Sequence, residues 1–318
     1  MLENLRRKSL VKTYIDSIHQ VHFEQGHVVY LDSFSLEQHK QRLSKKNQEK
    51  SFPSTFDGVS KGFRLISHAL GKVKFNMIAC PSGTFEMGHT SQTDNQPRQE
   101  TIEMPFLLGE TEITQELYEE VIRYNPSRFE NKFQKPVENV SWYDTIEFCN
   151  ELSRLHGLEQ CYILTDISTK DERGRDCNCI MSAQVTCDFN RNGYRLPTEK
   201  EWEYAAKAGT QNRWAGTDDE TKLGKYAWFG KDYNKGSTQL VKSKKPNEWG
   251  FYDMSGNVFE WCWDKYDSDN TNLDAKRVVR GGSWESNNQS LYSAFRYDFS
   301  PINLDKEVGF RVARSLVN

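Results

Sequence analysis

The sequence has no hydrophobic run that approaches the roughly 20 apolar residues needed to span a membrane. The N-terminal residues 1–8 carry the positive charge of a signal peptide, but no apolar segment follows them. We therefore expect no membrane span. Two interpretations of location stay open: a cytoplasmic protein, or an exported protein whose leader, with any lipid-anchor signal, was replaced by the starting Met.

The chain also lacks an excess of either charge. Lys and Arg total 42 and Asp and Glu total 45, so the net charge is −3, which argues against a nucleic-acid partner. Aromatic residues make up 13% of the 318 residues, and they bury large areas, so a folded core is expected. The length suits one elaborate domain with a small appendage.

Histidine and cysteine are missing from the C-terminal part. The last histidine is His156 and the last cysteine is Cys262. The commonest general base and metal ligand is therefore absent from the second half of the chain. This distribution disfavours an enzyme that would build its site there.

Four cysteines crowd into one stretch: Cys161, Cys177, Cys179 and Cys187. Their spacing lacks the C-x2-C pair of most structural zinc sites. A zinc site, local disulfides and free thiols all stay open, and free thiols are favoured.

Residues 1–72 differ in composition from the rest. We predict a helix over 10–18, a hairpin over 21–31 around Gly26, and helical propensity over 35–49. His19, His22 and Glu24 have the types of a metal triplet, but two solvated histidines beside a hairpin is the better interpretation. We therefore expect residues 1–72 to be a small appendage of unknown role, and residues 73–318 to be the main domain.

The main domain mixes a few capped helices with short strands. Residues 78–88 predict a strand, a turn and a strand. Helices are predicted after the N-caps Thr114 and Ser141, and after a capping box at Thr198 with Glu201. Beyond residue 210 the helical periodicity disappears and aromatic residues cluster, which indicates short irregular strands with long loops.

Seven motifs, in order, carry a resemblance to a known family: Gly83–Gly88, Glu110–Thr114, Val140–Asp144, Gly193–Ala206, Gly250–Trp261, Arg280–Trp284 and Val308–Arg314. Together they resemble the formylglycine-generating-enzyme, or sulfatase-modifying-factor, family. The resemblance implies an α+β fold: a C-type-lectin-like fold with irregular antiparallel sheets, few helices and long loops.

The resemblance also sets an expectation about catalysis. The enzymes of that family bind copper with two cysteines shortly after the Arg-Gly-Gly-Ser motif, and the matching positions here are Ser286 and Leu291. A thiolate site cannot be built from these residues. The related sulfoxide synthases use a His-His-Glu set from an N-terminal bundle, whose spacing His19, His22 and Glu24 miss by one residue. We therefore expect no enzyme activity and no catalytic cofactor.

Residues 285–307 combine aromatic and small polar side chains, the composition of a binding surface. Residues 278–314 are similar to the variable region of diversity-generating-retroelement proteins of spirochaete type, in which adenines of Asn codons are randomised. Twelve of the fourteen residues that we predict to contact ligand are reachable from an Asn codon in this way; Trp284 and Gln289 are the others. The predicted ligand-binding residues are Trp284, Ser286, Gln289, Ser290, Leu291, Tyr292, Phe295, Tyr297, Asp298, Phe299, Ser300, Ile302, Leu304 and Asp305.

The favoured function is therefore a non-catalytic variable protein that binds an unknown protein or surface ligand. Its expected location is the cell surface, from the resemblance alone. A divergent oxidase or sulfoxide synthase and a degenerate structural or sensory domain are the alternatives.

The resemblance further implies a structural calcium ion. Its ligands would be the side chains of Asp253 and Glu260 and the carbonyl groups of Gly256 and Val258. Oxygen ligands in a tight loop suit a hard cation. The alternative is that the polar side chains of this loop bond only its own backbone.

Overall fold

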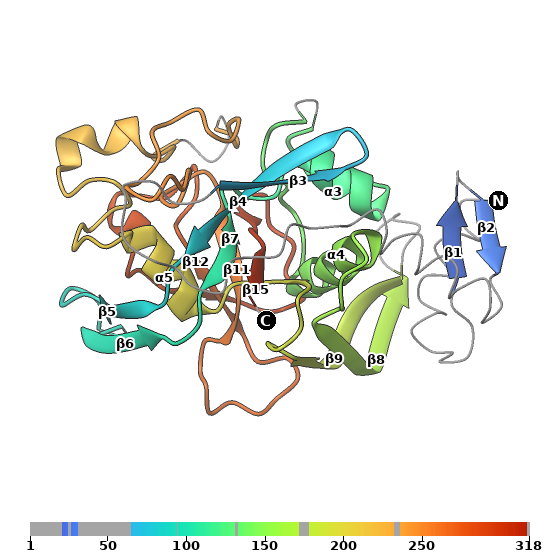
Figure 1. Ribbon diagram of the computed structural model, residues 1–318. Coiled ribbons are helices and arrows are strands. Elements are labelled where there is room, and N and C mark those ends of the chain that lie inside the picture. Colours follow the sequence, from blue (N-terminus) through green and yellow to red (C-terminus); the bar gives the residue numbers. More distant parts are fainter. Residues whose placement is uncertain are drawn as a thin grey trace. The chain divides into compact units, whose positions relative to one another are not determined.

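The computed structural model describes residues 21–24, 27–30, 65–93, 95–130, 133–171, 178–231 and 236–316 (Figure 1). The chain divides into two compact units. One unit comprises residues 1–61 and 164–185, and the other comprises residues 62–163 and 186–318. In the described part of the chain, no helix combines the length and the apolar character that a membrane crossing requires.

The N-terminal hairpin is confirmed. Strand β1 (Val21–Glu24) pairs with β2 (His27–Tyr30) in antiparallel register, with Glu24 opposite His27. Strands β8 (Tyr162–Asp171) and β9 (Asn178–Cys187) form a separate two-stranded sheet. The predicted helix over 10–18, the segment 35–49 and His19 lie outside the described residues.

A five-stranded antiparallel sheet forms one side of the core of the second unit. Its order is β10 (Tyr194–Arg195), β15 (Ala313–Ser315), β7 (Phe106–Gly109), β4 (Val73–Cys80) and β3 (Leu65–Leu70). Strand β3 pairs with β4 along its whole length, from Leu65 opposite Ile78 to Leu70 opposite Val73. The sheet therefore begins inside the segment that the sequence assigned to the N-terminal appendage.

A four-stranded sheet carries the C-terminal motifs. Its order is β13 (Tyr297–Phe299), β12 (Arg277–Arg280), β11 (Phe259–Lys265) and β14 (Val308–Gly309), and β14 runs parallel to β11. Strand β13 is thus an edge strand. A further hairpin joins β5 (Gly83–Met87) to β6 (Arg98–Ile102), so the predicted strand, turn and strand over 78–88 correspond to β4 and β5.

The three predicted helices are confirmed with their caps. Thr114 caps α3 (Gln115–Ile122), Ser141 caps α4 (Trp142–Leu155), and Thr198 caps α5 (Glu199–Lys207). In α5 the capping box is complete, because the Thr198 side chain accepts from the backbone of Glu201 and the Glu201 side chain accepts from the backbone of Thr198. Two short 3-10 turns, η1 (Glu220–Lys225) and η2 (Gln289–Leu291), interrupt the C-terminal loops.

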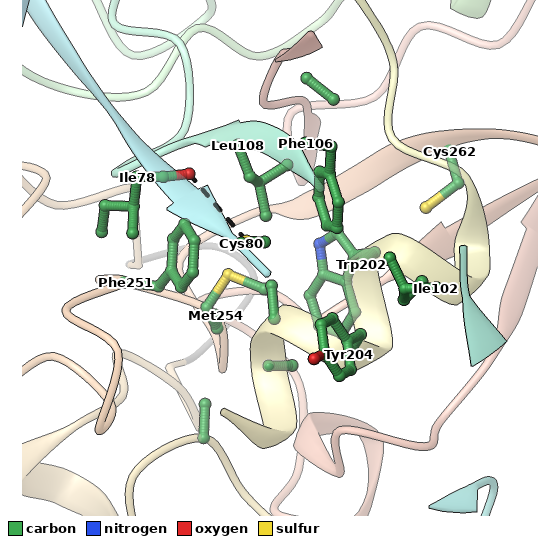
Figure 2. Close-up of a cluster of buried hydrophobic side chains, with 14 of the residues drawn as sticks. Ile78, Cys80, Ile102, Phe106, Leu108, Trp202, Tyr204, Phe251, Met254 and Cys262 are labelled. Carbon is green, nitrogen blue, oxygen red and sulfur yellow. Dashed lines mark hydrogen bonds between the residues drawn. The ribbon is translucent and has the colours of Figure 1, made fainter. Parts of the chain in front are cut away.

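The core lies where α5 packs on the five-stranded sheet (Figure 2). Trp202 of α5 is fully buried in the same cluster as Phe106 and Leu108 of β7 and Ile78 of β4. Burying a side chain of this size stabilises the fold by roughly 1.5–3 kcal/mol. The indole nitrogen of Trp202 is not left unpaired, since it donates to Oε2 of Glu260 at 2.7 Å.

Three buried arginines form ion pairs within or between the sequence motifs. Arg195 pairs with Glu201 through two hydrogen bonds of 2.7 Å, and Arg311 pairs with Glu260 through two of 2.6 Å. Arg280 of β12 reaches Glu199 at 2.7 Å and also binds Glu203, both on α5. Two-pronged, charge-assisted pairs of this kind set both distance and orientation, so α5 and the four-stranded sheet form one rigid base.

A hydrogen-bonded chain of rings lies at the β3 edge of the five-stranded sheet. The Tyr194 hydroxyl is 3.2 Å from Nδ1 of His68 and 2.8 Å from Nδ1 of His156. Burial, followed by the charges of Arg314 and His156, lowers the pKa of His68 to about 4. His68 is therefore neutral in the folded protein at physiological pH.

Candidate functional site

The predicted ligand-binding segment runs from the end of β12, through η2 and the edge strand β13, to the start of β14. Its flanks are fully buried: Arg280 and Ser283 before it, and Phe310 and Arg311 after it. The segment is thus held at both ends by the core.

Groups outside the segment hold its backbone between these ends. Side chains from three separate loops and from β12 donate hydrogen bonds to four of its carbonyl oxygens: Trp214 to Asn288 at 2.7 Å, Ser255 to Leu291 at 3.0 Å, Arg280 to Ser293 at 2.6 Å, and Asn95 to Ala294 at 2.8 Å. Each donor side chain lies outside residues 285–307. The path of the backbone therefore depends little on the segment's own exposed side chains.

Most predicted contact residues have side chains that are exposed or partly exposed to solvent. Gln289, Tyr297 and Ile302 are exposed, and nine others are partly buried: Ser286, Ser290, Tyr292, Phe295, Asp298, Phe299, Ser300, Leu304 and Asp305. Trp284 and Leu291 differ, because both are completely buried. Leu291 packs in a cluster with Trp214 and Leu223. Trp284 and Leu291 therefore lie beneath the surface and support it.

A row of aromatic rings lies along β13. Tyr297 and Phe299 are two residues apart in β13 and therefore point to the same face of the strand, and Phe295, just before the strand, stacks on Tyr297. Neighbouring rings are 6.4 Å and 5.3 Å apart, and Tyr297 is 46% exposed. Buried Phe259 and Trp261 lie behind Tyr297 and Phe299 at 6.0 Å and 6.1 Å. The row offers rigid contact area at an open sheet edge.

Three predicted contact residues also hold local structure. Ser286 Oγ accepts from the backbone of Ser283 at 2.9 Å, and Asp305 Oδ1 accepts from the backbone of Glu307 at 2.9 Å. Asp298 forms an ion pair of 2.6 Å with Lys276 across the edge of the sheet. We therefore expect replacement of Ser286, Asp298 or Asp305 to lower the stability of the segment more than replacement of a contact residue without such a bond.

A cavity of about 260 Å³ opens beside Tyr292. Its walls include His89 and Arg213, and the His89 ring meets the Tyr292 ring edge-on at 5.8 Å. Lys207 also lines it, but its ammonium group is already bound by the backbone oxygens of Glu86 and Gly88. The sequence did not point to this cavity, because its walls come from segments about 200 residues apart.

Two carboxyl groups meet next to Ser286. The Ser283 hydroxyl donates to Glu307, and Glu285 bonds the Glu307 side chain. Burial, followed by the interactions with Glu285, raises the pKa of Glu307 to about 7. Sequence reasoning did not place these two residues together.

Neither Ser286 nor Leu291, the positions that the resemblance matched to copper-binding cysteines, offers a thiolate. Ser286 is engaged with the Ser283 backbone, and Leu291 is in the apolar cluster. Cys161 and Cys187 are free thiols, as the sequence favoured, and Cys177 lies outside the described residues. Burial raises the pKa of Cys161 and, to about 12, that of Cys187, so both remain protonated and unreactive at neutral pH.

The predicted calcium loop fits only in part. Both oxygens of Glu260 are bound by Arg311, and one of them also by Trp202, so Glu260 does not fit as a metal ligand. Asp253 uses Oδ2 to accept from the backbone of Lys242, while its buried Oδ1 has no partner among the described residues. The described residues hold no group of three His, Cys, Asp or Glu side chains suited to a metal ion. Calcium at Asp253 stays a prediction.

Comparison with known proteins shows the family to which this architecture belongs. Residues 62–316 match the family described as the sulfatase-modifying factor enzyme 1-like domain. The chain belongs to this family. Its α+β architecture is the C-type-lectin-like fold that the motifs implied.

Three relatives of this sulfatase-modifying factor domain are informative. The structure of Treponema denticola variable protein 1 is 35% identical, with a TM-score of 0.70, over 79% of this chain and 99% of that chain. The chaperone protein LppX of Paenibacillus barcinonensis is 32% identical over 76% of this chain and 90% of its own length. The inactive C-alpha-formylglycine-generating enzyme 2 of Bos taurus is 25% identical over 75% of this chain and 87% of its own.

Proposed function

We propose that this protein is a non-catalytic variable protein, which displays diversified side chains on a C-type-lectin-like scaffold to bind a protein ligand outside the cell. The observation that carries the proposal is the anchoring of the segment 285–307. Its backbone is held by Trp214, Ser255, Arg280 and Asn95, which all lie outside it. Side chains on such a backbone can be exchanged while the surface keeps its shape.

The chemistry of the surface supports binding over catalysis. Tyrosine and phenylalanine give large contact area with little loss of rotamer freedom, and Ser, Asn and Asp give adaptable hydrogen bonds. Ser286 and Leu291 replace the two cysteines on which the oxidase chemistry depends. The similarity to a variable protein and to a relative named inactive supports the same choice.

The decisive test is genetic. We would sequence the gene and its downstream DNA from several isolates. The proposal expects a near-copy of codons 278–314 next to a reverse-transcriptase gene, and substitutions confined to the predicted contact residues. Substitutions spread evenly along the chain, with no such copy, would overturn it in favour of a degenerate structural domain.

A biochemical test addresses the alternative enzyme function. The purified protein is incubated with copper, oxygen and a cysteine-containing sulfatase peptide, and any aldehyde is detected with a hydrazide probe. We expect none from the protein, and none from the variant Ser286→Ala. Aldehyde formation by the unmodified chain would refute the non-catalytic assignment.

A further inference from the structure

We infer that a lysine surface next to the proposed binding face takes an acidic segment of the protein ligand. The inference rests on the proposed function for the face itself and adds the charge of the partner. Residues 222–245 contain seven lysines against one acidic residue, Asp232, a local charge of +6 in a chain whose net charge is −3. The lysine surface is defined here as Lys225, Lys231, Lys244 and Lys245.

The fold brings these four lysines together from two segments. The backbone of Lys245 donates to the carbonyl oxygen of Lys225 at 2.9 Å, and the Lys244 ammonium group donates to the neighbouring carbonyl of Gly224. Lys231 is close enough to repel Lys244, and this repulsion, second to burial, lowers the pKa of Lys244. Like charges are therefore held near one another at a cost to the folded state.

No carboxylate forms an ion pair with this surface within the described part of the chain, although the charge of Asp253 acts on Lys244. The other described lysines of the stretch do have ion pairs: Lys222 with Asp219 at 2.9 Å and Lys242 with Glu110 at 2.8 Å. Lys225, Lys231, Lys244 and Lys245 form none with described residues, and all but Lys244 are exposed. Uncompensated charge of one sign at a surface attracts and orients a partner of the opposite charge.

The lysine surface is continuous with the proposed binding face. The backbone of Lys231 donates to the carbonyl oxygen of Trp284 at 3.0 Å, and that of Gly230 donates to Ser286 at 2.9 Å. Trp228, in the segment of Lys225 and Lys231, is half-buried and contacts the other segment, with the Lys244 ammonium 3.8 Å from its ring centre. A ligand that contacts the face at Ser286 can thus extend over an apolar ring onto the lysines.

The residue types favour carboxylate groups over phosphate. Residues 222–245 contain no arginine, the side chain whose planar fork matches phosphate groups with two hydrogen bonds. Lysine is a compact point charge that accepts a carboxylate in many orientations. The negative net charge of the chain also disfavours extended polyanions, because a long polyanion interacts with the charge of the whole molecule. A short acidic peptide segment meets mainly the local positive charge.

The test uses fluorescein-labelled decaglutamate and measures anisotropy with the full chain at low and at physiological ionic strength. We expect binding that weakens with salt. The variant K231E/K244E is expected to bind about tenfold or more weakly, because charge reversal replaces attraction by repulsion. The matched control K72E/K74E changes the net charge by the same amount at exposed lysines near the β3–β4 turn, and we expect less than about a twofold change from it.

Three outcomes would overturn the inference: no binding of decaglutamate, equal weakening by both double variants, or binding of a heparin oligosaccharide without binding of decaglutamate. The last result would assign the surface to an anionic polysaccharide. Circular dichroism checks that both variants fold. Invariant contact residues among isolates would instead refute the proposed function, and would leave decaglutamate binding as a separate property of the lysine surface.

Discussion

Replacing Arg280 with methionine tests whether the buried ion pairs hold the binding face in place. The guanidinium group of Arg280 is fully buried and bridges Glu199 and Glu203 of α5, and it also donates to the Ser293 carbonyl of the binding segment. Burial by itself would raise the pKa of Glu203, yet the charges of Arg280 and Lys207 hold it below its ordinary value. Methionine keeps most of the side-chain length and removes only the charge and the donors.

The expected loss of stability depends on which partners Glu199 and Glu203 keep after Arg280 is replaced. Breaking a buried pair by removing one partner costs about 3–5 kcal/mol, because the other charge is left uncompensated. Glu199 keeps Arg296 at 2.6 Å, and Glu203 keeps Lys207 at 3.1 Å and the backbone of Gly88 at 2.6 Å. We therefore expect the lower end of that range, about 3 kcal/mol of unfolding free energy.

Urea denaturation of Arg280→Met and of the control Arg213→Met measures this difference. Arg213 forms an exposed pair with Asp218 at 2.8 Å, which water and salt screen, so its loss should leave the midpoint nearly unchanged. Equal midpoints for the two variants would refute the reasoning that the buried arginine holds the scaffold.

Three further outcomes are expected. Substituting the exposed residues together, as Gln289→Ala, Tyr297→Ser and Ile302→Ser, should cost less than about 1.5 kcal/mol by urea denaturation, since surface changes stay within about 0.5 kcal/mol each; a larger loss would mean that these side chains hold the segment. The pKa of His68 is about 4 in the folded protein and about 6.5 in the unfolded chain, so the unfolded chain takes up a proton at the higher pH. The free energy of unfolding therefore falls as the pH drops from about 6.5 to 4, by at most about 3 kcal/mol. His68→Phe should remove that part of the acid sensitivity, and an unchanged pH slope would contradict it. Calcium bound at Asp253 should raise the melting temperature of the protein but not that of Asp253→Asn. An unchanged melting temperature on both calcium addition and chelation would refute a calcium site in this loop.

Much of the local structure could be predicted because its causes are local in sequence. Thr114, Ser141 and Thr198 cap their helices through side-chain bonds that reach only three residues ahead. The pairing of β1 with β2 was predictable for the same reason, since the two strands are neighbours in sequence. The sequence also shows Ser286 and Leu291 instead of cysteines at the positions that the resemblance matched to the active site, since this depends on residue identity alone.

Tertiary structure alone decided which side chains face solvent and which partners they have. Glu260 lies in a motif typical of a calcium loop, but Arg311, 51 residues away, takes both of its oxygens. Trp284 and Leu291 have the residue types of a contact surface but are buried beneath it. The lysine surface and the binding face are joined through backbone bonds from Gly230 and Lys231 to Ser286 and Trp284. Such pairings arise when distant segments pack to bury their apolar faces, and no local pattern in the sequence records which segments will meet.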